Sequence, residues 1–207
     1  MASISFIGLG GMAQAIAARA IEGGNTVELI GRDAAKATTL AEALGGGATV
    51  GTFGAVPVGE IVVLAVPYAA VVQVVAEYGD ALAGKVIVDI SNTSKADATG
   101  LDVPEGSSAA QEIAAVAPAS ARVVKAFNTV FGHVLVKGGS FDVLFAGDDA
   151  ASKTTVSAFI ESLSLRPLDV GGLETARWLE GVGLLMISLA RNGVGNFDFS
   201  LGITTSR

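Results

Sequence analysis

The sequence predicts an α/β fold in which helices cover both faces of a parallel, doubly wound β-sheet. Short apolar segments rich in β-branched residues alternate with segments whose apolar residues recur at helical spacing. The apolar segments are continuous, which is typical of strands buried on both faces. The chain has 207 residues, 51% of them hydrophobic, so it can bury a substantial core as one domain with an elaboration.

The first half of the chain carries clear strand and helix patterns. The predicted strands are Ser3–Ile7, Thr26–Ile30, Glu60–Val66 and Lys85–Ile90, and the predicted helices are Gly10–Glu22, Asp33–Leu44 and Tyr68–Tyr78. A polar segment containing glycine and proline, residues 91–106, follows the fourth strand. Loops beyond the carboxyl ends of parallel strands border the ligand crevice, so we expect this segment to line a site.

The second half continues the alternation. Ser108 and Gln111 have the spacing of a capping box, which predicts a helix start at Ser108. Asp148 and Asp149 precede a helical pattern and can cap it. The predicted strands are Arg122–Phe127, Val143–Ala146 and Arg166–Val170, and the predicted helices are Ala150–Leu163 and Leu173–Arg191.

Composition excludes several classes of protein and site. The net charge is -7 with only 13 Lys and Arg, so we expect no binding to nucleic acid or to an anionic membrane. The chain has no cysteine and one histidine, which excludes disulfides and thiolate or His-pair metal sites, and we predict no metal. The apolar run at 61–76 is shorter than the ~20 residues that span a bilayer. The first residues lack the basic region of a signal peptide, so we expect a cytoplasmic protein.

The segment Gly8–Ala13 fits the pattern G-x-G-x-x-A directly after the first predicted strand. The first glycine permits the turn into the helix, the second lets backbone approach a pyrophosphate, and the small alanine lets helix and strand pack closely. The helix N-terminus adds amide donors and a positive dipole end. This context predicts a Rossmann dinucleotide site, in which the cofactor is held by Gly8, Leu9, Gly10, Gly11, Met12 and Ala13.

The end of the second predicted strand discriminates between NAD and NADP. An NAD site usually has an acid there, whereas this chain has Gly31 followed by Arg32. Arg32 can make a bidentate contact with the 2′-phosphate, and Lys36, one turn later, adds a second positive charge. The alternative is that Asp33 binds the ribose, but Asp33 also suits the N-cap of the following helix. We predict NADP.

Few side chains are available for acid–base chemistry. His133 could steer a substrate, although a bonded structural histidine is the more common case. Helix capping explains Asp148 and Asp149 better than a paired-carboxylate site does. Three aromatic residues could stack on a flat ring, but core packing is their expected role: Phe127, Phe131 and Trp178. The inventory predicts no catalytic side chain and favours direct hydride transfer, in which positioning matters most.

The chain resembles the NADPH-dependent reductases of the deazaflavin coenzyme F420 almost from end to end. The glycine loop and Arg32 match the NADP site of these proteins, and Ala65-Val66-Pro67-Tyr68 matches the segment beside the nicotinamide. Three motifs of the second half are more specific together: RVVKAFNTV (122–130), AGDD (146–149) and LRPLDVGGLETARWLE (165–180).

The resemblance implies a Rossmann NADP-binding domain at residues 1–125 and a small C-terminal acceptor-binding and oligomerisation lobe at 126–207. F420 would lie between them and exchange a hydride with NADP(H). The loop after Ile90 and the stretch 128–133 are the expected F420 contacts. The implied cofactor-binding residues of this region are Ala65, Val66, Pro67, Tyr68 and Asn128.

The resemblance also bears on partners. Family members are commonly dimers, so we expect a homodimer with the apolar Gly183–Ala190 at the interface. Lys125 or Lys137 could meet the acidic tail of F420. Two positions depart from the family, which usually carries Thr at Leu9 and Ser or Thr at Gly31.

Two other functions fit the same cofactor site. The chain could be an NADPH-dependent flavin or ferric reductase, because related reductase domains pass electrons to flavins and through them to ferric ions. It could also be an NADP(H)-sensing protein without turnover.

Overall fold

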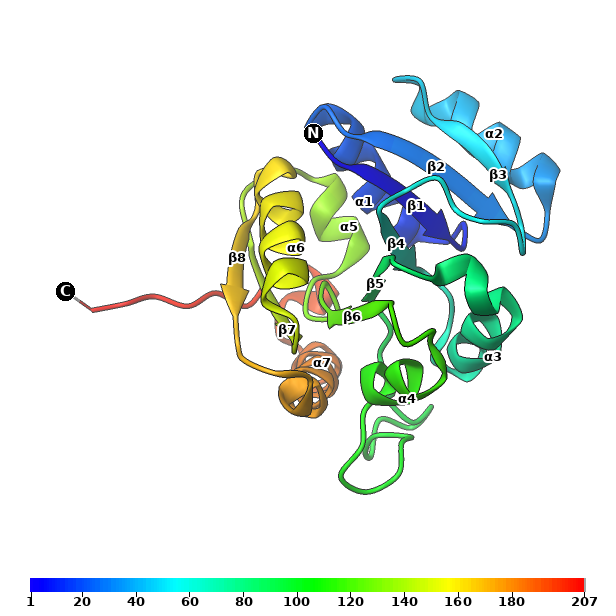
Figure 1. Cartoon of the computed structure of the whole chain (residues 1–207). Coiled ribbons are helices and arrows are strands. Elements are labelled where there is room, and N and C mark those ends of the chain that lie inside the picture. The colour runs from blue at the N-terminus through cyan, green and yellow to red at the C-terminus, as the bar shows by residue number, and fades with distance from the viewer. Residues whose placement is uncertain (207) are drawn as a thin grey trace.

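A computed structural model describes residues 1–206 and contains one eight-stranded sheet with helices on both faces (Figure 1). The strand order is β3-β2-β1-β4-β5-β6-β7-β8. The doubly wound α/β fold predicted from the sequence is confirmed. The strands are β1 (Ser3–Ile7), β2 (Thr26–Gly31), β3 (Thr49–Thr52), β4 (Ile61–Leu64), β5 (Val86–Asp89), β6 (Arg122–Lys125), β7 (Asp142–Gly147) and β8 (Arg166–Asp169).

Two hydrophobic cores lie on opposite faces of the sheet because successive side chains of a strand point to opposite sides. In β4, Ile61 and Val63 belong to one core, and Val62 and Leu64 belong to the other. The first core includes residues of α1, α2, α5 and α6, and the second includes residues of α3 and α4. The helices are α1 (Gly11–Glu22), α2 (Ala34–Leu44), α3 (Tyr68–Tyr78), α4 (Ala109–Val116), α5 (Gly132–Val136), α6 (Ala150–Ser162) and α7 (Ala176–Arg191).

The last two strands run against the other six. Strand β7 pairs with β6 in antiparallel fashion through Val124–Gly147 and Lys125–Ala146, and β8 is parallel to β7. The predicted parallel arrangement therefore holds from β3 to β6, and the β6–β7 pair is antiparallel. The connection from β6 to β7 contains only one short helix, α5, of five residues, and an antiparallel neighbour can be reached without a crossover over the sheet. The change in strand direction follows residue 125, where β6 ends. The division of the chain into a Rossmann domain and a C-terminal lobe at this residue stays a prediction.

Helix starts follow the predicted caps. The side chains of Asp33, Ser108 and Asp149 each accept a hydrogen bond from the backbone amide three residues later. Sequence reading missed β3 and α5. Strand β3 is a short, largely exposed edge strand, and α5 spans little more than one turn, so neither produces a strong periodic pattern.

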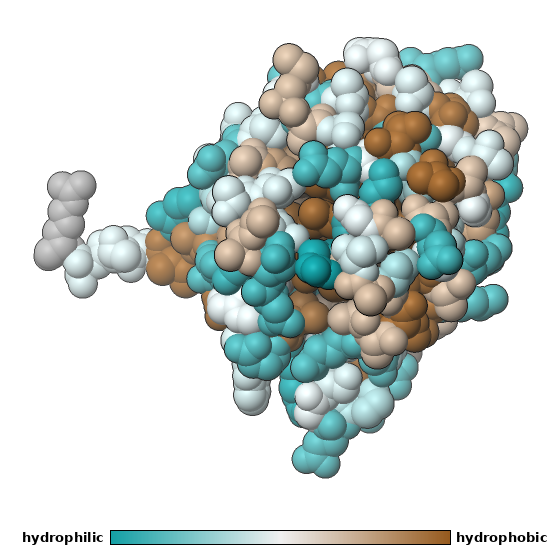
Figure 2. All heavy atoms as spheres, viewed as in Figure 1, coloured by the Kyte–Doolittle hydropathy of each residue, from teal (hydrophilic) through white to brown (hydrophobic). Residues whose placement is uncertain are grey.

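The apolar run at 61–76 divides into the buried strand β4 and most of helix α3. Within residues 1–206, no helix is long and apolar enough to cross a membrane. On the face shown in Figure 2, apolar residues are scattered among polar ones.

Candidate functional site

The glycine loop between β1 and α1 forms a backbone cradle. Gly8 has a φ of 115°, and a Cβ atom there would lie 2.2 Å from the carbonyl oxygen of Ala65, so only glycine fits. A Cβ atom at Gly10 or Gly11 would meet nothing within 4 Å, because the loop faces open space on that side. Ala13 is fully buried against the sheet, which confirms its predicted packing role. This loop fits a pyrophosphate, because backbone amides of the first helical turn are available and no side chain obstructs them.

A first cavity, of about 300 Å³, lies on one side of the glycine loop. Leu9, Gly31, Arg32, Lys36 and Phe53 line it, together with Val66 and Pro67 at the end of β4. The structure thus brings together the residues expected to contact the adenosine half of NADP. Cationic groups occur at one end, and most of the remaining lining is apolar.

Arg32 is already positioned by two neighbours. Its guanidinium lies 5.1 Å from the centre of the Phe53 ring. Its Nη2 atom also lies 3.2 Å from a carboxylate oxygen of Glu77 on α3. The carboxylate of Asp33 accepts the Lys36 amide at 3.0 Å, so the predicted capping role of Asp33 is confirmed. A single terminal nitrogen of Arg32 makes the ion pair, so a phosphate can be bound through the rest of the guanidinium.

A second cavity, of about 280 Å³, lies at the carboxyl ends of β4, β5 and β6. Its walls are mainly apolar, and Ser91, Asn92 and Asn128 supply polar groups. Val66 lines both cavities, so an extended ligand lying across the glycine loop would reach both. Further lining residues are Met12, Ala65, Ile90, Phe127, Val130, Phe131 and Gly132.

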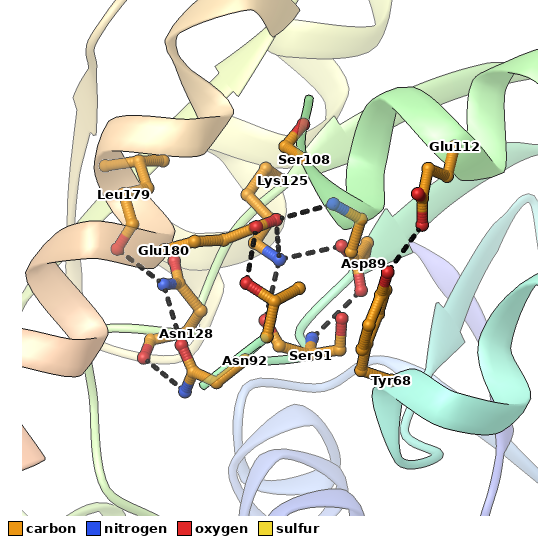
Figure 3. A network of polar contacts seen from close by, with 12 residues as sticks. Tyr68, Asp89, Ser91, Asn92, Ser108, Glu112, Lys125, Asn128, Leu179 and Glu180 are labelled. Carbon is orange, nitrogen blue, oxygen red and sulfur yellow. Dashed lines mark hydrogen bonds and ion pairs between the residues drawn. The ribbon is translucent and has the colours of Figure 1, made fainter. Parts of the chain in front are cut away.

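Tyr68, expected beside the nicotinamide, lines neither cavity. Its hydroxyl donates a 2.8 Å hydrogen bond to Glu112 on α4 (Figure 3). Burial and this carboxylate raise the pKa of Tyr68 well above its usual value. The side chain therefore joins α3 to α4 as a neutral donor.

An ionic network beneath the second cavity was not predicted from the sequence. Lys125 is fully buried, and its Nζ atom lies 2.8 Å from Asp89, 3.0 Å from Glu180 and 2.6 Å from the Ser91 carbonyl (Figure 3). The expectation that Lys125 meets an acidic tail of F420 is wrong, because the ammonium group has no exposed surface. Isolated charged residues within apolar strand and helix patterns were the sequence signal for such a network.

Glu180 of α7 connects four segments through this network. Its carboxylate contacts Lys125 of β6, accepts the Thr93 hydroxyl at 2.8 Å and accepts the Ala109 amide at the start of α4 at 3.0 Å. Burial raises the pKa of Glu180, and Lys125 opposes part of that increase. The first residues of the loop after β5, Ser91 to Thr93, are consequently held in place.

The remaining candidates take other roles. Phe127 is a core residue, as expected. Trp178 was expected in the core, but its position on α7 leaves it 71% exposed. His133 is exposed and stacks on Phe131 with ring centres 5.8 Å apart, and Lys137 pairs with Asp198. Among the described residues no hydrogen bond to the His133 side chain is found, so the expectation of a bonded histidine is not met.

Residues 3–93 match the family model described as NADP oxidoreductase coenzyme F420-dependent. This N-terminal part of the chain, just under half of its length, is therefore similar to that family. A structure of an Arthrobacter sp. FB24 protein, assigned provisionally as an F420-dependent NADP reductase, superposes with a TM-score of 0.85 at 25% identity. The match covers 99% of this chain and 100% of that one.

Two curated proteins that are similar to the chain differ in what their names describe. An F420-dependent NADP reductase from Methanocaldococcus jannaschii is 30% identical over 63% of this chain, and the metalloreductase STEAP3 from Rattus norvegicus is 36% identical over 52% of it. The chain matches 62% of the length of the former and 22% of the latter. The region that matches the family model includes the glycine loop. The names of the two relatives differ in the electron acceptor, which is F420 in one and a metal in the other.

Proposed function

We propose that the protein binds NADP(H) across the glycine loop and exchanges a hydride between the nicotinamide and the deazaflavin coenzyme F420. The observation that carries this proposal is the pair of cavities on either side of an unobstructed glycine cradle, with Arg32 and Lys36 at one end. Bound NADPH supplies the hydride, and the acceptor takes it up together with a proton from water.

The residues of the chain have separate binding roles in this proposal. Backbone amides from Gly8 to Ala13 hold the pyrophosphate, and Arg32 and Lys36 hold the 2′-phosphate. Ala65, Val66 and Pro67 cover the cofactor where it passes from the first cavity to the second. Asn128 contributes to the nicotinamide side, and Tyr68 acts at a distance by holding α3 against α4.

Positioning is the main contribution of the protein to catalysis. The second cavity has mainly apolar walls and few titratable neighbours, which suits transfer of a hydride between two flat rings with water excluded. The ionic network lies below this wall, and its groups are engaged with one another. Hydride transfer therefore proceeds without a catalytic side chain in this proposal.

One observation favours a second acceptor. The match to a metalloreductase at 36% identity is consistent with electron transfer from NADPH to a flavin and on to a ferric ion. Both activities use the same NADP(H) site and differ only in the ring that accepts the hydride.

The test is a spectrophotometric assay with NADPH and equal concentrations of F420, FMN or FAD, each with and without a ferric chelate. Rapid loss of the deazaflavin absorbance, with slow flavin reduction, is the expected result. Flavin-dependent ferric reduction without F420 turnover would replace the acceptor assignment by the metalloreductase alternative. Tight NADPH binding without oxidation by any acceptor would identify an NADP(H) sensor instead.

A further inference from the structure

Asn92 is held in one orientation at the wall of the second cavity although its side chain is exposed. Its Nδ2 atom donates to the Asn128 carbonyl at 3.0 Å, and its Oδ1 atom accepts from Asn128 Nδ2 at 3.1 Å. Asn128 Nδ2 also donates to the Leu179 carbonyl at 2.8 Å. Because carbonyl oxygens cannot donate, these bonds fix which end of each carboxamide is nitrogen.

Helix α7 leaves room for this asparagine pair. A Cβ atom at Gly183 would lie 2.3 Å from Asn92 Oδ1 and 3.3 Å from Asn128 Nδ2. A glycine inside a helix costs roughly 0.5–1 kcal/mol relative to alanine. The glycine at this position is therefore explained by the space that the two carboxamides occupy.

The backbone on both sides of Asn92 is fixed by the buried ionic network. The Ser91 carbonyl accepts from Lys125, and the Thr93 hydroxyl donates to Glu180. Figure 3 shows Asn92 at the edge of this network, next to Asn128. A side chain supported in this way is oriented before a ligand arrives, which is the arrangement expected of a recognition group.

The contacts determine which group of Asn92 is available to a ligand. Oδ1 accepts from Asn128 Nδ2 and lies beside Gly183, whereas Nδ2 uses one of its two hydrogens on the Asn128 carbonyl. The remaining Nδ2 hydrogen is a donor at the wall of a mainly apolar cavity. Among residues 1–206 no Lys or Arg lines this cavity, so an uncharged carbonyl oxygen suits this donor better than an anion does.

We propose that Asn92 Nδ2 donates a hydrogen bond to the carboxamide oxygen of the nicotinamide and thereby positions the ring, with Asn128 and Gly183 holding Asn92 in place. This inference rests on the NADP(H) binding proposed above. Asn92 acts as a cofactor-positioning residue, and it takes no part in proton transfer.

The test compares binding of NADP⁺ with binding of its thionicotinamide analogue, in which sulfur, a weak acceptor, replaces the carboxamide oxygen. Dissociation constants are measured by calorimetry for the unaltered protein, Asn92→Ala and Asn192→Ala. Asn192 is a matched control, because it is an exposed asparagine that bonds the Ser188 carbonyl at the end of α7. The fragment 2′,5′-ADP, which lacks the nicotinamide, is measured with each protein.

The unaltered protein and Asn192→Ala should prefer NADP⁺ over the thio analogue by about fivefold, the size of one hydrogen bond. Asn92→Ala should lose this preference, bind NADP⁺ about fivefold more weakly and bind 2′,5′-ADP normally. An unchanged preference in Asn92→Ala, or equal weakening of 2′,5′-ADP, would overturn the inference and leave the proposed NADP(H) site standing. Failure of the unaltered protein to bind NADP⁺ and 2′,5′-ADP would overturn both proposals.

Discussion

Leu9 and Gly31 compete for one volume at the first cavity: a Cβ atom on Gly31 would lie 2.4 Å from Leu9 Cδ1. Leu9 is almost fully buried and belongs to the hydrophobic core. The two departures from the family pattern, a leucine for threonine and a glycine for serine or threonine, are thus sterically linked. The larger residue at position 9 fits because position 31 has no side chain.

Gly31→Ala should therefore destabilise the protein by about 1–3 kcal/mol through overpacking. Adding Leu9→Ala should relieve the collision, so the double variant loses less free energy of unfolding than the sum of the single variants. Urea unfolding followed by circular dichroism gives these values. Gly10→Ala is the control, because its Cβ atom meets nothing within 4 Å; strictly additive losses at positions 9 and 31 would contradict the linkage.

Arg32→Ala should weaken NADPH binding about 10- to 100-fold while NADH binding changes little, because a charge-assisted contact to the 2′-phosphate is lost. Titration of cofactor fluorescence with both dinucleotides checks this result. Arg122→Ala serves as the control, because this exposed arginine lies at the start of β6 and lines neither cavity. Equal weakening for NADPH and NADH would remove Arg32 from the 2′-phosphate site.

Lys125→Met should reduce the free energy of unfolding by about 3–5 kcal/mol, because two buried carboxylates lose their cation. Lys137→Met removes an exposed pair with Asp198 and should cost less than about 1 kcal/mol. Chemical denaturation of both variants under one set of conditions provides the comparison. Similar small losses of unfolding free energy in the two variants would show that Lys125 does not stabilise the buried network.

The buried carboxyl group of Glu180 predicts a pH dependence of stability. Its pKa is raised in the folded protein, so the folded state retains a proton that the unfolded state has already released. Its contribution is therefore fully present below the unfolded pKa and decreases as pH rises through the folded pKa. The difference in unfolding free energy between the unaltered protein and Glu180→Gln should change with pH in this direction. A difference independent of pH across that range would contradict the raised pKa.

We expect a homodimer in which exposed apolar side chains of helix α7 form the subunit contact. Trp178 and Leu185 are 71% and 56% exposed on this helix, and large apolar side chains on one element favour a subunit contact. Leu185→Glu should shift the protein from dimer to monomer in analytical ultracentrifugation. Val136→Glu, a change at an exposed valine on α5, should leave the oligomeric state unchanged. A monomer at all concentrations of the unaltered protein would exclude the proposed interface.

The sequence predicted the elements that have strong local patterns. The glycine loop, the caps at Asp33, Ser108 and Asp149, and the buried strands all occur where periodicity and turn chemistry placed them. These features depend on residues close together in the chain, so a single sequence is sufficient to detect them.

Long-range features could not be predicted in the same way. Asp89, Lys125 and Glu180 are separated by at least 36 residues and meet only because β5 and β6 end at the same edge of the sheet and α7 begins close to it. The reversal of β7 depends on how the chain returns after β6, and the orientation of Asn92 depends on Gly183 of a distant helix. Each of these requires the tertiary arrangement that the local patterns do not specify.

The attachment of residues 91 and 93 to buried charges restricts how a bound cofactor can leave. Lifting this part of the loop would withdraw a carbonyl from Lys125 and a hydroxyl from Glu180 in an apolar interior. A hinge at the root of the loop would therefore cost free energy, and beyond the root Arg191 of α7 donates to the carbonyls of residues 96 and 97. A bound cofactor should consequently leave past a floor of the crevice that keeps its shape between turnovers.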